Sequence, residues 1–255
     1  MALVVTPLSN LPLIEPGDDL ANLLMQSLKT TGIQLCDGDI LVLAQKIVSK
    51  AEGRLVNLST VEPSTRANEL AEITKKDARL LELILRESQA VLRTGFNTII
   101  VEHRLGFICA NAGIDHSNVR GPWGNEEDWV LLLPEDPDAS ARRLQEQIAA
   151  HSHIHIGVVI IDSHGRAWRN GTVGVTIGLA GVPGIVDMRG TADLFGFRLR
   201  ITQIGAADEL AAAASLMMGQ AAEGSPAVHV HGFPYALRDS ALTELIRPKE
   251  QDLFR

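Results

Sequence analysis

The stretch IHIGVVIID, residues 154–162, predicts the centre of the fold. Its apolar residues begin at Ile154 and continue to Ile161, and continuous apolar runs are typical of a strand that is buried on both faces. A second buried strand is expected at residues 40–43. Further strands are expected in a hairpin at 98–113, in the glycine-rich segment 171–190 and at 226–232.

Helices are expected between these strands. The first follows Asp18 or Asp19, either of which can cap it, and ends at Gly32. The apolar spacing in residues 64–94 predicts helix throughout, and the alanine-rich residues 206–219 predict another.

One more helix is expected after the turn at 134–138, with Asp138 or Ser140 as its cap. The polar tail from Arg238 onward is expected to be loosely held. Since helices and strands do not alternate strictly, the order predicts an α+β fold with mixed sheets. The 255 residues are interpreted as a single unit, with any division into two subdomains left unassigned.

Composition excludes several classes of protein. The net charge of −8 and the pI of about 5.5 argue against nucleic-acid binding. The sequence contains no run of about twenty apolar residues, so no membrane span is predicted. The N-terminus lacks the basic and apolar regions of a signal peptide. The two cysteines, Cys36 and Cys109, are far apart and are expected to be reduced thiols, so we expect a cytoplasmic protein without a zinc site.

Two carboxylates stand where apolar runs end. Asp162 closes the stretch quoted above, and Asp115 follows GFICANAGI. Two such carboxylates could share a divalent ion, with a hydroxyl completing its shell. The alternative is that each caps its own turn, and position alone favours the turn.

Lysines and histidines allow similar alternatives. Lys46 and Lys50 follow the strand at 40–43 and could hold phosphate oxygens, or could form a solvated basic face. No phosphate-binding loop of the G-x-x-x-x-G-K-[ST] type is present, and no catalytic triad can be assembled. The histidines are interpreted as surface residues at strand entries: His151, His153, His155, His229 and His231.

Six segments together resemble one known family. They are GDILVLAQKIVSKAEGR, GFICANAGIDHSNV, LLPEDPDASARRL, VVIIDSHGRAWRNG, GIVDMRGTADLFG and ADELAAAASLMMGQAAEG. In this order they are similar to the coenzyme F-420:L-glutamate ligase (F-420-0:γ-glutamyl ligase) family, over about residues 11–233. No single motif is decisive, but six long motifs in sequence are specific.

The resemblance implies an activity and an assembly. It implies a ligase that uses GTP to join L-glutamate to the deazaflavin coenzyme F-420-0 through an acyl phosphate, with Mg²⁺ or Mn²⁺ and with K⁺ as activator. It also implies an α+β fold and an intertwined homodimer. Two alternatives stay open: a related acyl-phosphate ligase with another acceptor, and a non-catalytic deazaflavin-binding module.

The resemblance also implies site residues. Asp115, Asp162 and Ser163 match the metal-binding positions, with Ser163 in the place of a usual Thr. The positions that match nucleotide contacts are Leu11, Pro12, Leu13, Ile14, Gln45, Lys46, Lys50, Asn118, Gly219, Gln220 and Glu223. Two residues depart from the family pattern, because His164 replaces a common aromatic residue and Met188 a common Tyr. Some relatives carry a C-terminal flavin-reductase-like domain, and this chain is expected to lack one.

An anionic substrate on an acidic protein requires a locally positive cleft. We expect arginines to supply part of that charge, and the candidates are Arg166, Arg169, Arg189 and Arg198.

Overall fold

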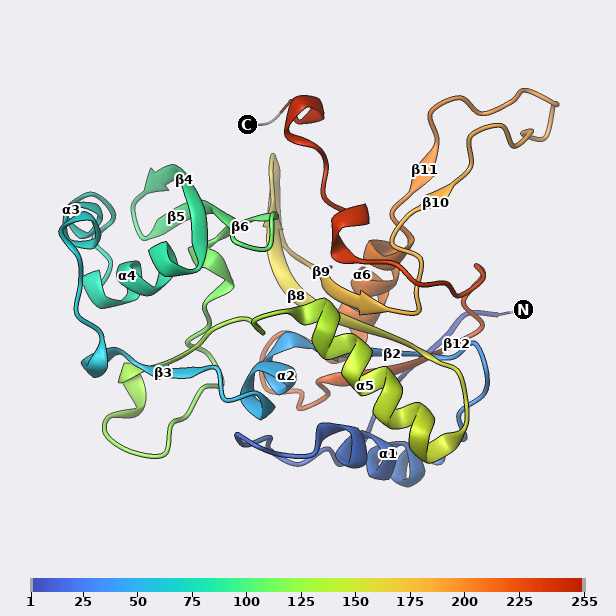
Figure 1. Cartoon of the computed structure of the whole chain (residues 1–255), viewed down its shortest axis with the longest axis horizontal. Helices are drawn as coiled ribbons and strands as arrows, with labels where there is room; N and C mark the ends of the chain where they lie inside the picture. Colours follow the sequence, from blue (N-terminus) through green and yellow to red (C-terminus); the bar gives the residue numbers. More distant parts are fainter. Residues whose placement is uncertain (1, 254–255) are drawn as a thin grey trace.

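A computed structural model describes residues 2–253 (Figure 1). Its main sheet has the strand order β1-β12-β2-β8-β9. The strands are β1 (Val4–Pro7), β2 (Ile40–Ala44), β8 (Gly157–Arg166), β9 (Arg169–Ala180) and β12 (Ala227–His231). β2 and β8 pair in parallel and the other neighbours are antiparallel, so the prediction of a mixed sheet in an α+β fold is confirmed.

Helices cover both faces of this sheet. Helix α1 (Leu20–Thr31) and helix α5 (Pro137–Ser152) pack on one face, and α6 (Ala206–Met218) packs on the other (Figure 1). Alternate residues of β8 serve the two cores: Val158 and Ile160 face α1 and α5, whereas Val159 and Ile161 face α6. The central strand is therefore buried on both faces, as its apolar run predicts.

A smaller part of the chain lies beside the main sheet, at the left of Figure 1. It contains a sheet of β4 (Ser88–Gly95), β5 (Thr98–His103) and β6 (Ile108–Ala110), a pair of β3 (Leu55–Asn57) and β7 (Trp129–Leu131), and helices α3 (Thr65–Thr74) and α4 (Ala78–Arg86). Short 3-10 turns join these elements: η1 (Leu58–Thr60), η2 (Asn111–Gly113) and η3 (Glu126–Asp128). The predicted hairpin at 98–113 is β5 and β6.

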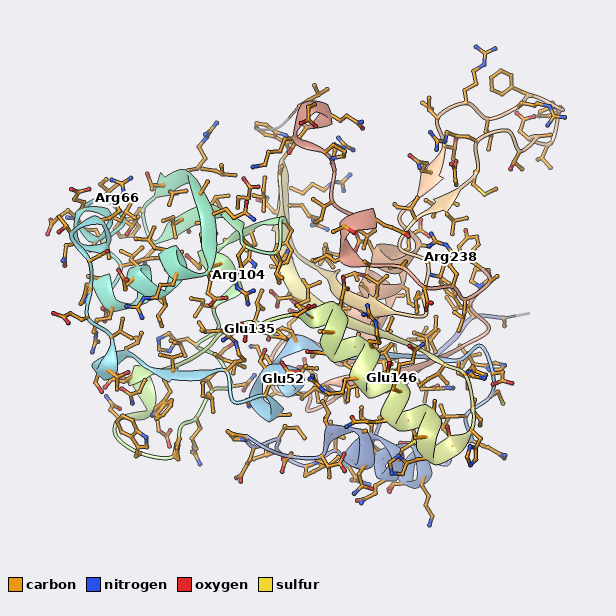
Figure 2. All side chains as sticks on the ribbon, in the orientation of Figure 1. Glu52, Arg66, Arg104, Glu135, Glu146 and Arg238 are labelled. Atoms are coloured by element: carbon orange, nitrogen blue, oxygen red, sulfur yellow. The ribbon has the colours of Figure 1, made fainter. Side chains whose placement is uncertain are left out.

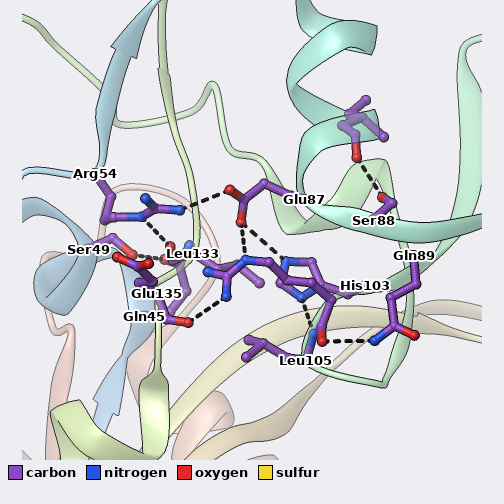
Figure 3. Close-up of polar contacts among 12 residues, drawn as sticks. Gln45, Ser49, Arg54, Glu87, Ser88, Gln89, His103, Leu105, Leu133 and Glu135 are labelled. Atoms are coloured by element: carbon purple, nitrogen blue, oxygen red, sulfur yellow. Dashed lines mark hydrogen bonds and ion pairs between the residues drawn. The ribbon is translucent and has the colours of Figure 1, made fainter. Parts of the chain in front are cut away.

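A cluster of charged side chains joins the small part to the main sheet (Figures 2 and 3). The Glu87 carboxylate accepts hydrogen bonds from Arg54 at 3.1 Å and from Arg104 at 2.9 Å. Arg54 also donates to the carbonyl of Leu133, and Arg104 to that of Glu135. Because three segments share one largely buried carboxylate, the cluster holds the two parts of the molecule together.

An arm projects from the main body between β10 (Val186–Asp187) and β11 (Gln203–Ile204), at the upper right of Figure 1. Large apolar side chains on this arm are almost fully exposed, at 97% for Leu194, 96% for Phe195 and 88% for Ile201. Exposure of large apolar side chains to water does not stabilise an isolated chain. Surfaces of this kind typically mediate association between protein chains.

Several local predictions are wrong. Residues 64–94 are not one helix, because Lys75 adopts a left-handed conformation that ends α3, Asp77 caps α4, and the chain then enters β4. The cap of α5 is Asp136 rather than Asp138 or Ser140. The predicted strand at 154–161 starts only at Gly157, and it continues four residues past Asp162 to Arg166.

The C-terminal tail and one histidine also differ from the predictions. The tail forms η4 (Leu242–Glu244) and η5 (Lys249–Gln251), and Leu242 is buried in the core beside α6. His229 is not a surface residue, because it is buried and hydrogen-bonded to Asp39 at 2.8 Å. The buried side chain of Leu242 holds the tail against the core, so the polar composition of the tail does not predict its packing.

Candidate functional site

The candidate site lies at one edge of the main sheet. β2 and β8 run in parallel and β12 runs against β2, so the ends of β2 and of the core part of β8 meet the start of β12. The Ala44 amide donates to the carbonyl of Pro226 at 2.8 Å, and the Leu8 amide to that of Ala227 at 2.9 Å. The segments after β1 and β2 and the loop before β12 are thereby brought to one place. Most of the matched residues come from these segments and from β8, and Asp115 and Asn118 come from the segment after η2.

Asp115 is brought to this edge by an unusual turn. Asn111, Ala112 and Gly113 in η2 all have positive φ, at 54°, 53° and 66°. Left-handed backbone is costly for residues other than glycine and persists where the surrounding structure imposes it. Two backbone hydrogen bonds with Leu131, at 3.0 and 2.9 Å, then fix Asp115 itself.

The side chain of Asp115 contacts the first turn of α2 (Gln45–Ala51), a helix that sequence patterns did not indicate. Gln45 donates to one carboxylate oxygen at 2.6 Å, and the Lys46 ammonium lies 3.3 Å from the other. The Ser49 hydroxyl donates to the Gln45 carbonyl oxygen at 2.8 Å, which turns the amide nitrogen toward Asp115. Burial, opposed by Lys46 and aided by the charge of Asp162, raises the pKa of Asp115 to about 6.

Two lysines of α2 are held against the segment that follows Asp115. Lys46 donates to the carbonyl and hydroxyl oxygens of Ser117, and Lys50 donates to the carbonyl of Asn118 at 2.8 Å. The Asn118 amide donates to the carbonyl of Ala221 at 3.0 Å. Burial, together with the charge of Lys46, lowers the pKa of Lys50. The two positive charges are therefore concentrated in one place, next to the loop before β12.

Asp162 lies near Asp115 on the face of β8 that carries Val158 and Ile160. The two carboxylates are close enough for the charge of Asp162 to raise the pKa of Asp115. The ring nitrogen Nε2 of His164 lies 3.0 Å from the Asp162 carboxylate. Burial and the Asp162 charge raise the pKa of the Cys109 thiol to about 12, so this thiol is protonated at neutral pH.

Ser163 points to the opposite face of the same strand. Its register partner Gly174 faces α6, where an added Cβ would lie 2.5 Å from the Cβ of Ser215. The Ser163 hydroxyl donates to Gln220 at 2.9 Å, and Gln220 donates to Ser215 at 3.1 Å. The structure therefore groups Ser163 with the loop before β12 rather than with the two aspartates.

That loop starts at Gly219, the C-terminal cap of α6. Gly219 has a φ of +73°, a conformation that favours glycine, and a Cβ added to it would lie 2.2 Å from Cδ of Glu223, so the Glu223 side chain would have to move. The Glu223 carboxylate accepts the Ala221 amide at 2.7 Å, which closes the loop on itself. Gly219, Gln220 and Glu223 thus belong to one structured turn.

The segment 11–14 follows β1 toward the same edge, with mixed exposure. Ile14 is buried in the core beside α1, whereas Leu13 is 91% exposed. Within residues 2–253, the hydrogen-bond partners of Asp115 and Lys50 lie outside the segment 11–14. The nucleotide contacts of residues 11–14 therefore stay a prediction.

Three of the four arginines expected to line the site are engaged elsewhere. Arg189 is paired with Asp187 on the arm, and Arg198 donates to the carbonyl of Gly190. Arg166 donates to the carbonyl of Asn170 in the β8–β9 turn. In this conformation Lys46 and Lys50 are the basic side chains that contact the Asp115–Asn118 segment.

The donor set at Asp115 and Asp162 suits a hard divalent cation. Within residues 2–253, no cluster of three or more His, Cys, Asp or Glu side chains could hold a metal ion. Mg²⁺ does not require such a cluster, because it is commonly held by one or two carboxylates together with waters and substrate phosphates. Two adjacent carboxylates, one with its pKa raised, and two nearby lysines fit this arrangement.

Comparison with known proteins identifies the family. The family model described as F420-0:gamma-glutamyl ligase matches residues 9–232. The chain belongs to this family. A coenzyme F420:L-glutamate ligase from Methanothermobacter thermautotrophicus is 45% identical over 257 residues, covering 100% of both chains. One from Methanopyrus kandleri is 46% identical over 246 residues, covering 95% of this chain and 93% of the relative. One from Archaeoglobus fulgidus is 41% identical, covering 100% of this chain and 97% of the relative.

Sequence patterns missed Ser49 and Ser117, which hold Gln45 and Lys46 in place. Ser49 could have been found had α2 been expected, because it lies one turn after Gln45 on the same helical face. In the described part of the chain, no helix is long and apolar enough to cross a membrane.

Proposed function

We propose that this protein is a ligase that joins L-glutamate to coenzyme F420-0 through a γ-linked amide, with GTP as the source of energy, Mg²⁺ or Mn²⁺ as the divalent cation and K⁺ as activator. Family membership supports the coarser part of the proposal, a ligase of coenzyme F420 biosynthesis. GTP, the cations and the reaction sequence are our inference.

One observation carries the proposal. Asp115 is held by Gln45 and Lys46, while Lys50, Asn118 and the loop before β12 form a chain of hydrogen bonds beside it. Residues matched from distant parts of the sequence thus form one polar site with two carboxylates and two ammonium groups. Phosphoryl transfer requires chiefly positioning and charge neutralisation, and this site offers both.

The proposed reaction has two steps. An oxygen of the F420-0 carboxylate attacks the γ-phosphorus of GTP, GDP leaves, and an acyl phosphate forms. The glutamate amine then attacks the acyl carbon, phosphate leaves, and the nitrogen loses a proton. A divalent cation, when bound, would neutralise phosphate charge during the first step.

The side chains of the site have defined tasks in this scheme. Asp115 and Asp162 would hold the cation, and Lys46 and Lys50 would bind phosphate oxygens as point charges. Asn118 and the loop at 219–223 would contact the nucleotide. With these groups in place, no protein nucleophile is needed, which agrees with the protonated state of the Cys109 thiol.

Product analysis tests the proposal. The purified protein is incubated with F420-0, GTP, L-glutamate and Mn²⁺, and the products are measured by mass spectrometry and by GDP release. We expect a mass increase of one or more glutamate residues and one GDP for each amide formed. GDP release without amide formation, or amide formation with ATP at equal or higher efficiency, would refute the proposal.

Variants of the two carboxylates test the shared site. Asp115→Asn and Asp162→Asn should each abolish most of the activity, and the double variant should lose little more, because residues that act as one unit are non-additive. Asp208→Asn is a matched control, since Asp208 lies on α6, on the other face of the main sheet from the carboxylate pair, where it accepts the Thr176 amide. If either site variant keeps its activity, the two aspartates do not share a cation and the turn-capping interpretation is correct.

We also propose that the protein is a homodimer joined through the arm at residues 187–203. The nearly complete exposure of Leu194, Phe195 and Ile201 supports this proposal, because association would remove that surface from water. Light scattering tests the mass of the assembly.

A further inference from the structure

We propose that His164 is a positioning residue, which orients the Asp162 carboxylate for the cation that the proposed function requires. The inference rests on that function, since it assigns a task to a residue next to Asp162. It starts from the geometry of one hydrogen bond, between His164 Nε2 and one Asp162 oxygen, at 3.0 Å.

The hydrogen bond is sheltered from solvent. The side chain of His164 is 11% exposed and that of Asp162 is 13% exposed, so water competes weakly for either group. Both lie on the same face of β8, two residues apart, where the pleat brings alternate side chains together. When the Asp162 carboxylate holds a cation it carries no proton and can only accept, so His164 Nε2 is then the donor of this hydrogen bond.

Packing fixes the plane of the His164 ring. Phe107 lies against it, with ring centroids 5.3 Å apart and planes tilted by 48°. The His103 ring also stacks on Phe107, with ring centroids 4.9 Å apart and planes almost parallel at 5°. Phe107 itself packs against three of the hydrophobic clusters, so the stack cannot shift without disturbing the cores.

His103 forms a fixed base for this stack. It is fully buried, and its Nδ1 accepts the amide of Leu105 at 3.1 Å. Burial, aided by the charges of Arg104 and His164 and opposed by Glu87, lowers the pKa of His103 to about 4. The ring is therefore neutral and immobile at neutral pH, and it supports Phe107 without adding charge near Asp162.

Such a hydrogen bond has a defined effect on a cation site. A carboxylate that binds a cation can rotate about its Cβ–Cγ bond, and a fixed donor on one oxygen leaves the other available to the ion in one orientation. Partners of this kind typically change metal affinity by about 10- to 100-fold. His164 thus belongs to the site through Asp162, without a contact of its own to the reacting groups.

A matched pair of variants tests the role of one atom. In His164→Gln the amide nitrogen replaces Nε2, whereas in His164→Asn it takes the place of Nδ1 and cannot reach Asp162. The control is His151→Asn, at an exposed position on α5 whose ring contacts the Gln147 carbonyl. Binding of Mn²⁺ alone is measured by electron paramagnetic resonance of the free ion, and the melting temperature is recorded for each variant.

We expect His164→Asn to weaken Mn²⁺ binding by about 10-fold or more and His164→Gln to stay within about threefold of the wild type. The Mn²⁺ concentration for half-maximal activity should shift by the same factors, with kcat at saturating Mn²⁺ changed much less. The proposal would be overturned if His164→Asn and His164→Gln bound Mn²⁺ with equal affinity, whether or not that affinity is lower than that of the wild type. It would also be overturned if the wild type did not bind Mn²⁺.

The outcomes separate this inference from the proposed function. If the wild type forms no amide, the proposed function fails whatever the variants bind. If it forms the amide and His164→Asn binds Mn²⁺ as the wild type does, only the positioning role fails. If His164→Asn melts far below the wild type, His164→Phe, which keeps a ring against Phe107 but has no donor, replaces it in the comparison.

Discussion

Asp115 should destabilise the metal-free protein at neutral pH, although it belongs to the site. Its pKa is raised from 3.8 to about 6, chiefly by burial. A carboxylate that holds its proton more tightly in the folded state favours folding while protonated and opposes it when ionised. The penalty is absent below about pH 4, grows as the pH rises toward 6, and is complete above that value.

The size of the penalty follows from the pKa. A rise from 3.8 to about 6 corresponds to about 3 kcal/mol, at about 1.4 kcal/mol for each pH unit. In Asp115→Asn the oxygen can still accept the hydrogen bond of Gln45, and the charge is removed. We therefore expect this variant to be more stable than the wild type by about 1 to 3 kcal/mol at pH 7.5, because relaxation reduces the full value. For a chain of this length that is about 2 to 12 °C in melting temperature.

Thermal unfolding in EDTA, followed by circular dichroism from pH 4 to pH 8, measures the effect. The gain of Asp115→Asn should disappear near pH 4, and added Mn²⁺ should raise the melting temperature of the wild type but not of the variant. A variant that melts below the wild type at pH 7.5 without metal, or a difference that does not change with pH, would contradict the reasoning.

Asp39 offers a control of opposite sign. Although burial raises its pKa, hydrogen bonds from His229, the Cys36 amide and His231 outweigh that effect and lower it. Its stabilising contribution is present above the unfolded pKa and is lost as the pH falls. Asp39→Asn should therefore lower the melting temperature at pH 7.5. If both variants shifted in the same direction, burial and partners would not be the cause of the difference.

Three further predictions follow from the site and the arm. Lys50→Met should weaken GTP binding by about 10-fold in calorimetric titration with little change in melting temperature, because a charge held at the site is removed without a large loss of packing. Gly219→Ala should weaken GTP binding, since the added Cβ lies 2.2 Å from Cδ of Glu223, whereas Gly17→Ala, with a φ of +90° and nothing within 4 Å, should cost only about 1 kcal/mol of stability and leave binding unchanged. The wild type should scatter light as twice 27.5 kDa, and Phe195→Asp should give a monomer, because a charge replaces an apolar side chain on the arm.

The main sheet could be predicted because its strands are unambiguous. Residues 156–161 and 40–43 are almost entirely apolar and lie in the core, and the helix at 206–219 and the strand at 226–232 are also predicted correctly. The prediction of one helix over residues 64–94 is wrong because the apolar spacing of α4 continues into β4. There, strand pairing with β5 outweighs the helical pattern. Local propensity is a weak guide when long-range pairing competes with it.

The site could be predicted in its residue types but not in its geometry. Asp115, Asp162 and the lysines were named from their places after apolar runs and from family motifs. Position alone favoured a turn for Asp115, and the structure does place it just after one, at η2. No pattern in the sequence indicated three successive left-handed residues before Asp115, because only one of them is glycine.

The pleat of β8 explains how one strand supplies two different functions. Asp162 and His164 point toward the face where Asp115 lies, and Ser163 points toward the loop before β12. A bulge in β9, where Gly178 pairs with Ile160 and Thr176 with Ile161, stands just before this stretch. Bulges bend a strand and increase its twist, and they are common beside active sites. The strand therefore leaves the core at the point where its side chains change from apolar to polar, so carboxylates can be placed at the site without interrupting the pairing of β8 with β9.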